Sequence, residues 1–171
     1  AQFEVCAHKW ADLSEEGYGV SLMNDCKYGH SIKNGDIGLT LLKSGIEPNA
    51  EADREKHRFT YSLYPHTGNW KRAKTAQMAC GLNVPFYTRL EPSHPGRLPQ
   101  EYSMVQVDSD NVMLETVKKA HGRSDIVVRL HEYHGRRTRA AMVLAIPFTS
   151  VWECDLLENE IALAPAEGPK I

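Results

Sequence analysis

The chain has 171 residues, of which 42% are hydrophobic and 25% are charged, and its formal net charge at pH 7 is −2. A chain of this size buries roughly two thirds of its unfolded surface, so it can fold as one domain without a disulfide or a metal. The charge disfavours a nucleic-acid partner, because affinity for phosphates requires a concentrated basic face.

Cysteine usage and the lack of targeting signals favour a cytoplasmic protein. The four cysteines form no C-x-x-C pair, so neither a zinc knuckle nor a redox dithiol is indicated. The sequence has no Asn-x-Ser/Thr acceptor, no charged-then-apolar leader and no long apolar run, so we expect no membrane partner. Because the chain begins with Ala1, we also expect a processed product or an excised part of a longer polypeptide.

The first 45 residues are predicted to be mainly β. Residues 2–6 are expected to form a short strand, and residues 10–17 a turn-rich link. Residues 18–23 and 37–41 then alternate with the period of two that is typical of half-buried strands. These two strands are expected to form either a β-arch or a wide hairpin.

The segment between these two strands is rich in reactive side chains. Gly29 and the Asn34-Gly35 pair supply positions that tolerate a positive φ. Polar groups on a glycine-hinged loop above a sheet suit a binding edge, although a solvated turn is the plain alternative. The polar residues of this segment are Asn24, Asp25, Cys26, Lys27, Tyr28, His30, Ser31 and Lys33.

After a polar loop, residues 57–65 form the clearest predicted strand, and Pro65 is expected to stop its pairing. Asn69 is then positioned to cap a helix over residues 70–80, with Gly81 placed to end it. We expect a single helix, laid across the sheets.

The remainder of the chain is predicted to be β. An irregular connection rich in proline spans residues 91–101, where a domain boundary is possible. Turn signals at short, regular spacing then separate the strands, which is typical of a β-sandwich. The strand at 139–148 has apolar residues on both faces, as expected for a central strand. The predicted strands are 103–107, 111–119, 125–134, 139–148, 151–158 and 160–164.

No catalytic residue and no metal ligand is predicted in this chain. His131, Glu132 and His134 superficially resemble a zinc motif, but histidines three apart on a strand project to opposite faces. The sequence also has no nucleophile elbow, phosphate-binding loop or dinucleotide fingerprint.

Several long motifs, in one order, carry a resemblance to a known family. They are FEVCAHKWADLSEEGYGVSLMNDCKYGHSI, LTLLKSG, EADREKHRFTYSLYPHTGNW, VVRLHEYHG and CDLLE. Together they resemble the C-terminal part of the retaining α-mannosidases of glycoside hydrolase family 38, most of all the cytosolic, vacuolar and bacterial branch. The resemblance runs from about Phe3 to Glu158. It implies an all-β fold over residues 1–171: a single large antiparallel β-sandwich of the galactose-mutarotase-like supersandwich type, with one short helix.

The resemblance also implies that the chain is part of a larger enzyme that hydrolyses terminal α-mannosides. In this family the nucleophile and the zinc, or another divalent metal, belong to an N-terminal α/β domain that has no counterpart here. We therefore expect the chain to be inactive alone, to hold no cofactor and to scaffold the catalytic and helical domains. A final strand beyond Ile171 is expected to be missing. The sheet edge that this strand would cover is then unpaired, and edge-to-edge pairing with a second copy to form a homo-oligomer is one alternative.

The resemblance assigns loops of this region to the edge of the sugar pocket. Carboxylates, amides, basic groups and an aromatic ring suit a hydroxyl-rich ligand when they are rigidly held. The same residues could instead close an Asx turn, fill an interdomain seam or be solvated. A free-standing carbohydrate-binding module and a purely structural interdomain module are the alternative functions. The predicted sugar-binding residues are Asn24, Asp25, Lys27, Tyr28 and Lys43.

Overall fold

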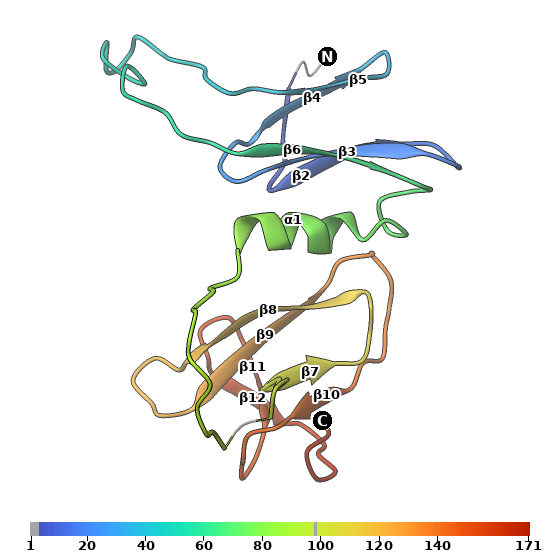
Figure 1. Ribbon diagram of the computed structural model, residues 1–171, viewed down its shortest axis with the longest axis vertical. Coiled ribbons are helices and arrows are strands. Elements are labelled where there is room, and N and C mark those ends of the chain that lie inside the picture. The colour runs from blue at the N-terminus through green and yellow to red at the C-terminus, as the bar shows by residue number, and fades with distance from the viewer. Residues whose placement is uncertain (1–3, 98) are drawn as a thin grey trace. The chain divides into compact units, whose positions relative to one another are not determined.

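The computed structural model describes residues 4–97 and 99–171, and it shows antiparallel strands with one short helix (Figure 1). This confirms the predicted all-β class. The contacts within the chain divide it into two compact units, Ala1–Glu91 and Pro92–Ile171. The division falls at the proline-rich connection of the sequence. A single sandwich domain over the whole chain stays a prediction, and each unit is described by itself.

Two three-stranded antiparallel sheets build the first unit. The sheet with order β2-β3-β6 contains β2 (Trp10–Ser14), β3 (Gly19–Asn24) and β6 (Tyr61–His66). The sheet with order β1-β4-β5 contains β1 (Val5–Cys6), β4 (Gly29–Lys33) and β5 (Asp36–Leu39). The strand predicted at 2–6 is confirmed at Val5–Cys6, and residues 2 and 3, like Phe3 of the motif, lie outside the described residues.

The two strands of the predicted arch or hairpin lie in different sheets, so the arch is correct. Its connection is shorter than expected, however, because residues 29–33 form β4 instead of a turn. The reason is the Asn34-Gly35 pair, whose φ values of 54° and 87° make a two-residue hairpin turn between β4 and β5. The turn makes the polar segment before it pair with β5 as a strand. Alternation of apolar residues does not predict this strand, because the segment is polar.

The turn-rich link predicted at residues 10–17 is wrong over its first half. β2 pairs with β3 along its whole length, from Trp10 opposite Met23 to Ser14 opposite Gly19. Asp12 resembles a turn residue in the sequence, but its carboxylate is buried and hydrogen-bonded within the unit. Contacts with distant parts of the unit therefore stabilise this segment as a strand, although its own residues have only a weak preference for β structure.

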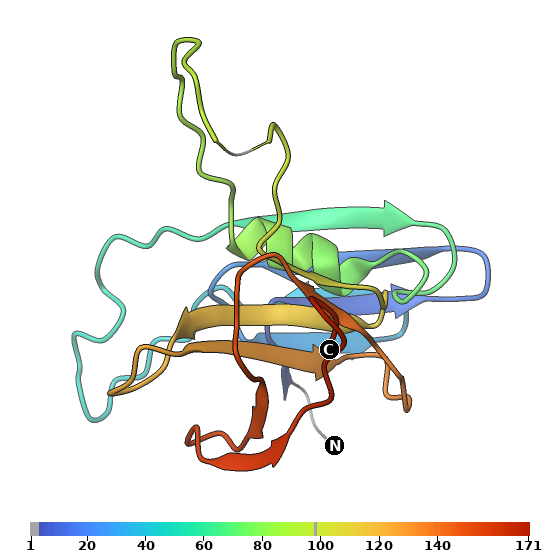
Figure 2. The ribbon, with the colours of Figure 1, turned by 90° about the horizontal axis from the view of Figure 1, so that it is seen from below.

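The single helix within the described residues, α1 (Thr75–Asn83), begins later than predicted. Asn69 does cap, since its Oδ1 accepts two backbone N–H groups at 3.1 Å, but it caps the turn that precedes the helix. Lys74, with φ 55°, separates that turn from the helix, and Gly81 lies inside the helix. Figures 1 and 2 show α1 along one face of the β2-β3-β6 sheet. Within the described residues, no helix is long and apolar enough to cross a membrane.

In the described residues of the second unit, the strands form three two-stranded antiparallel sheets. All six predicted strands are present but shorter than predicted. The pairs are β7 (Val105–Val107) with β10 (Met142–Leu144), β8 (Val112–Lys119) with β9 (Ile126–Glu132), and β11 (Trp152–Cys154) with β12 (Glu160–Leu163). β10 has a central position, because Met142 N also donates to Ile171 O at 2.9 Å on its other side. Only Leu144 of this strand is buried, however.

The accessible surface is large for a chain of this size, at 13,795 Å². A compact monomer of 19.2 kDa exposes about 8,400 Å², and two separate compact units of half that mass expose about 10,000 Å². Many large apolar side chains of the described residues are exposed, and the buried apolar residues given for them are few.

Candidate functional site

An open hollow of about 340 Å³ lies on the first unit beside the connection between β3 and β4. β1 and β5 flank β4 in one sheet, so the chain after β1, the arch and the chain after β5 meet at one place. Backbone hydrogen bonds fix them there: Ala7 N donates to Tyr28 O at 2.9 Å, and Thr40 N donates to Gly29 O at 2.8 Å. The lining includes Glu4, Cys26, Lys27, Tyr28, Thr40, Lys43, Asp53 and His57.

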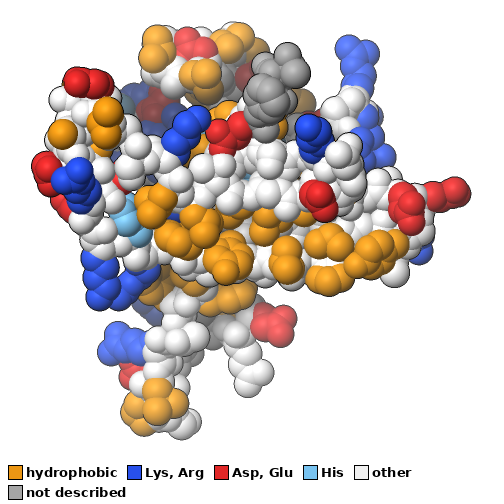
Figure 3. Space-filling model, turned by 90° about the horizontal axis from the view of Figure 1, so that it is seen from above, with side chains coloured by type: hydrophobic (Ala, Val, Ile, Leu, Met, Phe, Trp, Pro, Cys, Tyr) orange, Lys and Arg blue, Asp and Glu red, His pale blue; other side chains and the backbone are white. Residues whose placement is uncertain are grey.

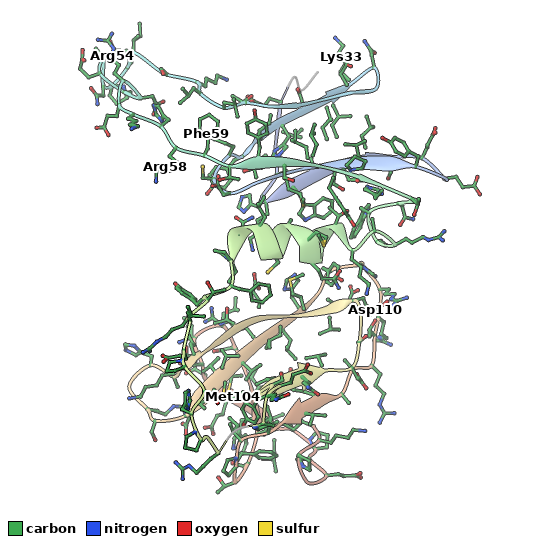
Figure 4. All side chains as sticks on the ribbon, viewed as in Figure 1. Lys33, Arg54, Arg58, Phe59, Met104 and Asp110 are labelled. Atoms are coloured by element: carbon green, nitrogen blue, oxygen red, sulfur yellow. The ribbon has the colours of Figure 1, made fainter. Side chains whose placement is uncertain are left out.

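Three of the five predicted sugar-binding residues line this hollow. The Tyr28 side chain is 56% exposed, and the ring of His8 supports it edge-on at 5.0 Å between centroids. Lys27 Nζ lies 4.8 Å from the ring centroid of Phe59, which Figure 4 shows on the segment that leads into β6. Lys43 Nζ lies 3.8 Å from Glu4 Oε2, but with 83% of its side chain exposed this pair is screened by solvent.

Asn24 does not line the hollow, because it is 1% exposed. Its Oδ1 accepts a hydrogen bond from Lys27 N at 2.6 Å, and its carbonyl oxygen accepts one from Asn83 Nδ2 at 3.0 Å. Its Nδ2 lies 3.4 Å from Nε2 of the fully buried His30. These bonds close the arch and fix the backbone on which Lys27 and Tyr28 stand.

Asp25 also lies outside the lining and ties the arch to the strand after the long loop. Its Oδ1 accepts a hydrogen bond from Thr60 N at 2.9 Å. The backbone of Thr60, followed by the Cys26 thiol, lowers the pKa of Asp25 below its usual value. A hydrogen bond with the Asp25 carboxylate, followed by desolvation, raises the pKa of the Cys26 thiol, which makes this exposed thiol a poor nucleophile.

Sequence reasoning missed four polar residues of the lining. Glu4 precedes β1 and accepts a hydrogen bond from the Thr40 hydroxyl, 36 residues away. Asp53 and His57 belong to the polar loop, where His57 Nε2 lies 2.8 Å from Asp53 O. Only the pairing of β1 with β4 brings Glu4 to this place, and no local pattern encodes that pairing.

A second cluster, also missed, is buried between α1 and the β2-β3-β6 sheet. Asp12 Oδ2 lies 2.7 Å from both Ser21 Oγ and His66 Nε2, and Ser21 Oγ lies 2.8 Å from Thr75 Oγ1. Ser21 and Thr75 are fully buried. This cluster is not a catalytic triad, because the carboxylate bonds to both other groups and the hydroxyl has no bond to the imidazole and no access to a substrate.

The contacts of His131, Glu132 and His134 hold the local fold together. Asn111 Nδ2 donates to Glu132 Oε1 at 2.6 Å, and His134 N donates to the same oxygen at 2.8 Å. His131 Nδ1 lies 3.3 Å from Glu115 Oε2. Across residues 4–97 and 99–171, no group of three or more His, Cys, Asp and Glu side chains is placed to hold a metal ion.

The second unit has a hollow of its own, of about 670 Å³, at the turn between β8 and β9. Lys118 and Arg123 line it, but Lys118 pairs with Glu158, and Arg123 Nη1 lies 3.0 Å from Glu160 Oε1. Since these two basic groups pair with nearby carboxylates, they contribute little attraction for an anion in this hollow.

Comparisons with known proteins identify the relatives of this chain. Residues 1–51 match the C-terminal domain of glycosyl hydrolases family 38, and residues 111–170 match the C-terminal β-sandwich domain of that family. One match falls within each of the two units. The chain is 42% identical over 162 residues to human α-mannosidase 2C1 and 40% identical over 163 residues to α-mannosidase G of Dictyostelium discoideum. Each alignment covers 93% of this chain but only 15% of the relative.

Solved structures show the same fold at lower identity. An α-mannosidase from Enterococcus faecalis superposes with a TM-score of 0.77 and 18% identity, over 98% of this chain and 19% of that one. The matches define the class first: this is the C-terminal β region of a glycosyl hydrolase. More particularly, the chain belongs to glycosyl hydrolase family 38, and it spans about 15% of the length of the curated relatives that it matches.

Proposed function

We propose that this chain is the C-terminal β region of an α-mannosidase that hydrolyses terminal α-mannosides, and that the hollow beside the arch forms part of the wall of the sugar pocket. The observation that carries the proposal is the convergence of Lys27, Tyr28 and Lys43 in one hollow on a sheet. The human and Dictyostelium relatives are α-mannosidases by name, which supports the choice of substrate.

In this proposal the residues of the chain bind and position the sugar and do not react with it. The exposed Tyr28 ring packs against the apolar face of the sugar and its hydroxyl bonds to a sugar hydroxyl. The ammonium of Lys43, which lines the same hollow, donates to a hydroxyl of the same sugar in place of its weak pair with Glu4. Asn24 and Asp25 act as positioning residues, since their hydrogen bonds fix the arch.

The reacting groups belong to the rest of the polypeptide. A retaining glycosidase needs two carboxylates that flank the scissile bond, and these, with the zinc or other divalent metal, are expected in the catalytic domain. The N-terminal catalytic and helical domains of the same polypeptide are therefore the partners. The chain alone is expected to be inactive, and a location in the cytoplasm and a homo-oligomer remain parts of the proposal.

The test uses the full polypeptide that contains this chain and measures kcat and KM for an aryl α-mannoside. Tyr28→Ala is expected to lower kcat/KM about 10-fold or more, because a lost sugar contact of about 1.4 kcal/mol corresponds to a factor of ten. Tyr18→Ala is the matched control, since Tyr18 has nearly the same exposure, 53%, and does not line the hollow. Lys43→Ala and its control Lys33→Ala make a second pair.

Three results decide between the alternatives. Equal kcat/KM for the Tyr28 and Tyr18 variants contradicts the role of the hollow. Cleavage of the aryl mannoside by the 171-residue chain alone contradicts the assignment of the chemistry to other domains. Calorimetric binding of mannose to that chain, lost in Tyr28→Ala, favours a free-standing carbohydrate-binding module.

A further inference from the structure

The strand β6 lies at the open edge of the β2-β3-β6 sheet. Within the described residues only β3 pairs with it. Pro65 was expected to stop the pairing, but β6 continues to His66, with Pro65 opposite Val20. A proline is tolerated within a strand when its missing N–H lies on the unpaired side, which is the case at an edge.

The hydrogen-bonding pattern between β3 and β6 identifies which backbone N–H and C=O groups of β6 point away from β3. Asp25 N donates to Thr60 O at 3.2 Å, so Thr60 directs its backbone groups toward β3. Orientation alternates along an antiparallel strand, so Tyr61 and Leu63 direct theirs to the open edge. Pro65 follows in the same phase, which agrees with its lack of an N–H. Two residues of β6 thus present both a donor and an acceptor to a further strand.

The side chains of these two residues are also uncovered. Leu63 lies opposite Leu22 on the same face of the sheet, yet Leu22 is 6% exposed and Leu63 is 64% exposed. Tyr61, on that face as well, is 58% exposed. Figure 3 shows hydrophobic side chains gathered in a row on the face of the molecule seen from above. An exposed apolar edge strand with open backbone groups is a template for strand addition.

We propose that β6 is the docking edge for an extended segment from the remainder of the same polypeptide, which pairs with Tyr61 and Leu63 and covers their side chains. The relatives contain more than five times the length of this chain, so such segments exist in them. Pro65 limits the pairing, because beyond Leu63 the edge offers no N–H. The inference rests on the proposed function in one respect: it requires the longer polypeptide.

The experiment measures amide hydrogen exchange by mass spectrometry, at single-residue resolution, in the full polypeptide. The amides of Tyr61 and Leu63 are expected to exchange at least about 100-fold more slowly than those of an exposed chain, because they donate to the added strand. Leu63→Lys places an ammonium where the added strand packs, so it is expected to speed the exchange of both amides about 10-fold or more. Leu63→Thr, which retains a β-favouring side chain, is expected to have a smaller effect in the same direction.

The matched control is Leu157→Lys, at an 82% exposed position between β11 and β12, and it is expected to leave both amides unchanged. Unprotected amides in the full wild-type polypeptide overturn the inference, and protection that disappears on dilution to a monomer assigns the edge to a second copy. Mannosidase activity separates the two proposals: an active polypeptide with unprotected amides refutes only the docking edge, and an inactive one with protected amides refutes only the proposed function.

Discussion

Asp12 has a buried, hydrogen-bonded carboxylate in the first unit. Its side chain is 4% exposed, and that of its partner His66 is 3% exposed. Both the imidazole and the Ser21 hydroxyl depend on one carboxylate oxygen. A residue that the sequence suggests for a turn therefore joins three segments of the fold.

Asp12→Ala is expected to destabilise the protein by about 3 kcal/mol, because it removes the shared acceptor of two buried groups. Asp36→Ala, at an exposed position of β5, is the control and is expected to change stability by no more than about 0.5 kcal/mol. Urea denaturation measures both. Equal effects of the two substitutions contradict a structural role for the cluster.

Glu132 makes the stability depend on pH. Desolvation opposes its ionisation, but hydrogen bonds from the Asn111 side chain and from three backbone N–H groups outweigh it and bring the pKa down from 4.5 to about 2. A carboxylate whose pKa is lower in the folded state stabilises the fold above its unfolded pKa. This contribution is therefore complete above about pH 5 and is lost as the pH falls toward 2.

Glu132→Gln is expected to destabilise the protein at pH 7, and the difference from wild type should shrink between pH 5 and pH 2. Chemical denaturation at several pH values measures this difference. Glu153→Gln, at an exposed position of β11, controls for the removal of one carboxylate. A difference for Glu132→Gln that stays constant with pH contradicts the stated cause.

At the scale of the element, the β4–β5 hairpin decides where the arch ends. A Cβ at Gly35 meets no atom within 4 Å, so only its φ of 87° matters there. Gly81, inside α1, also has open space around a Cβ, and its φ is not positive. The same substitution at the two sites therefore separates backbone conformation from packing.

Gly35→Ala is expected to destabilise the protein by about 1 kcal/mol, because alanine is strained at positive φ. Gly81→Ala is expected to stabilise it by about 0.5 to 1 kcal/mol through helix propensity. Thermal denaturation of both variants checks the signs. Effects of equal sign contradict the hairpin turn or the extent of the helix.

Local patterns predicted the elements of the second half in order but overestimated their lengths. The prediction at 139–148 marks β10 correctly, yet only Met142–Leu144 pair. Periodicity reports which residues are apolar, whereas the length of a strand depends on how far its neighbours extend. Local residue types are also insufficient to place the start of the helix: Asn69 predicts a start at residue 70, but the helix begins only after Lys74.

At the scale of the whole molecule, the exposed apolar surface is the dominant property. The accessible area exceeds that of two separate compact units of half this mass by about 3,800 Å². Contiguous exposed apolar surface on a protein marks sites of association. Side chains such as Phe86 and Leu90, which are almost entirely exposed, are therefore expected to be covered in the larger polypeptide.

The sequence by itself determined the class of the fold, the order of most strands and the family, because alternation and long ordered motifs are local or linear properties. It also selected Lys27, Tyr28 and Lys43, which share one hollow. Only the tertiary structure decided that Asn24 is buried, that Glu4 joins the hollow and that Asp12 lies in a strand. Each of these features depends on pairing between segments that are distant in the sequence. The order of neighbouring residues does not specify the hydrogen bonds that fix such pairing.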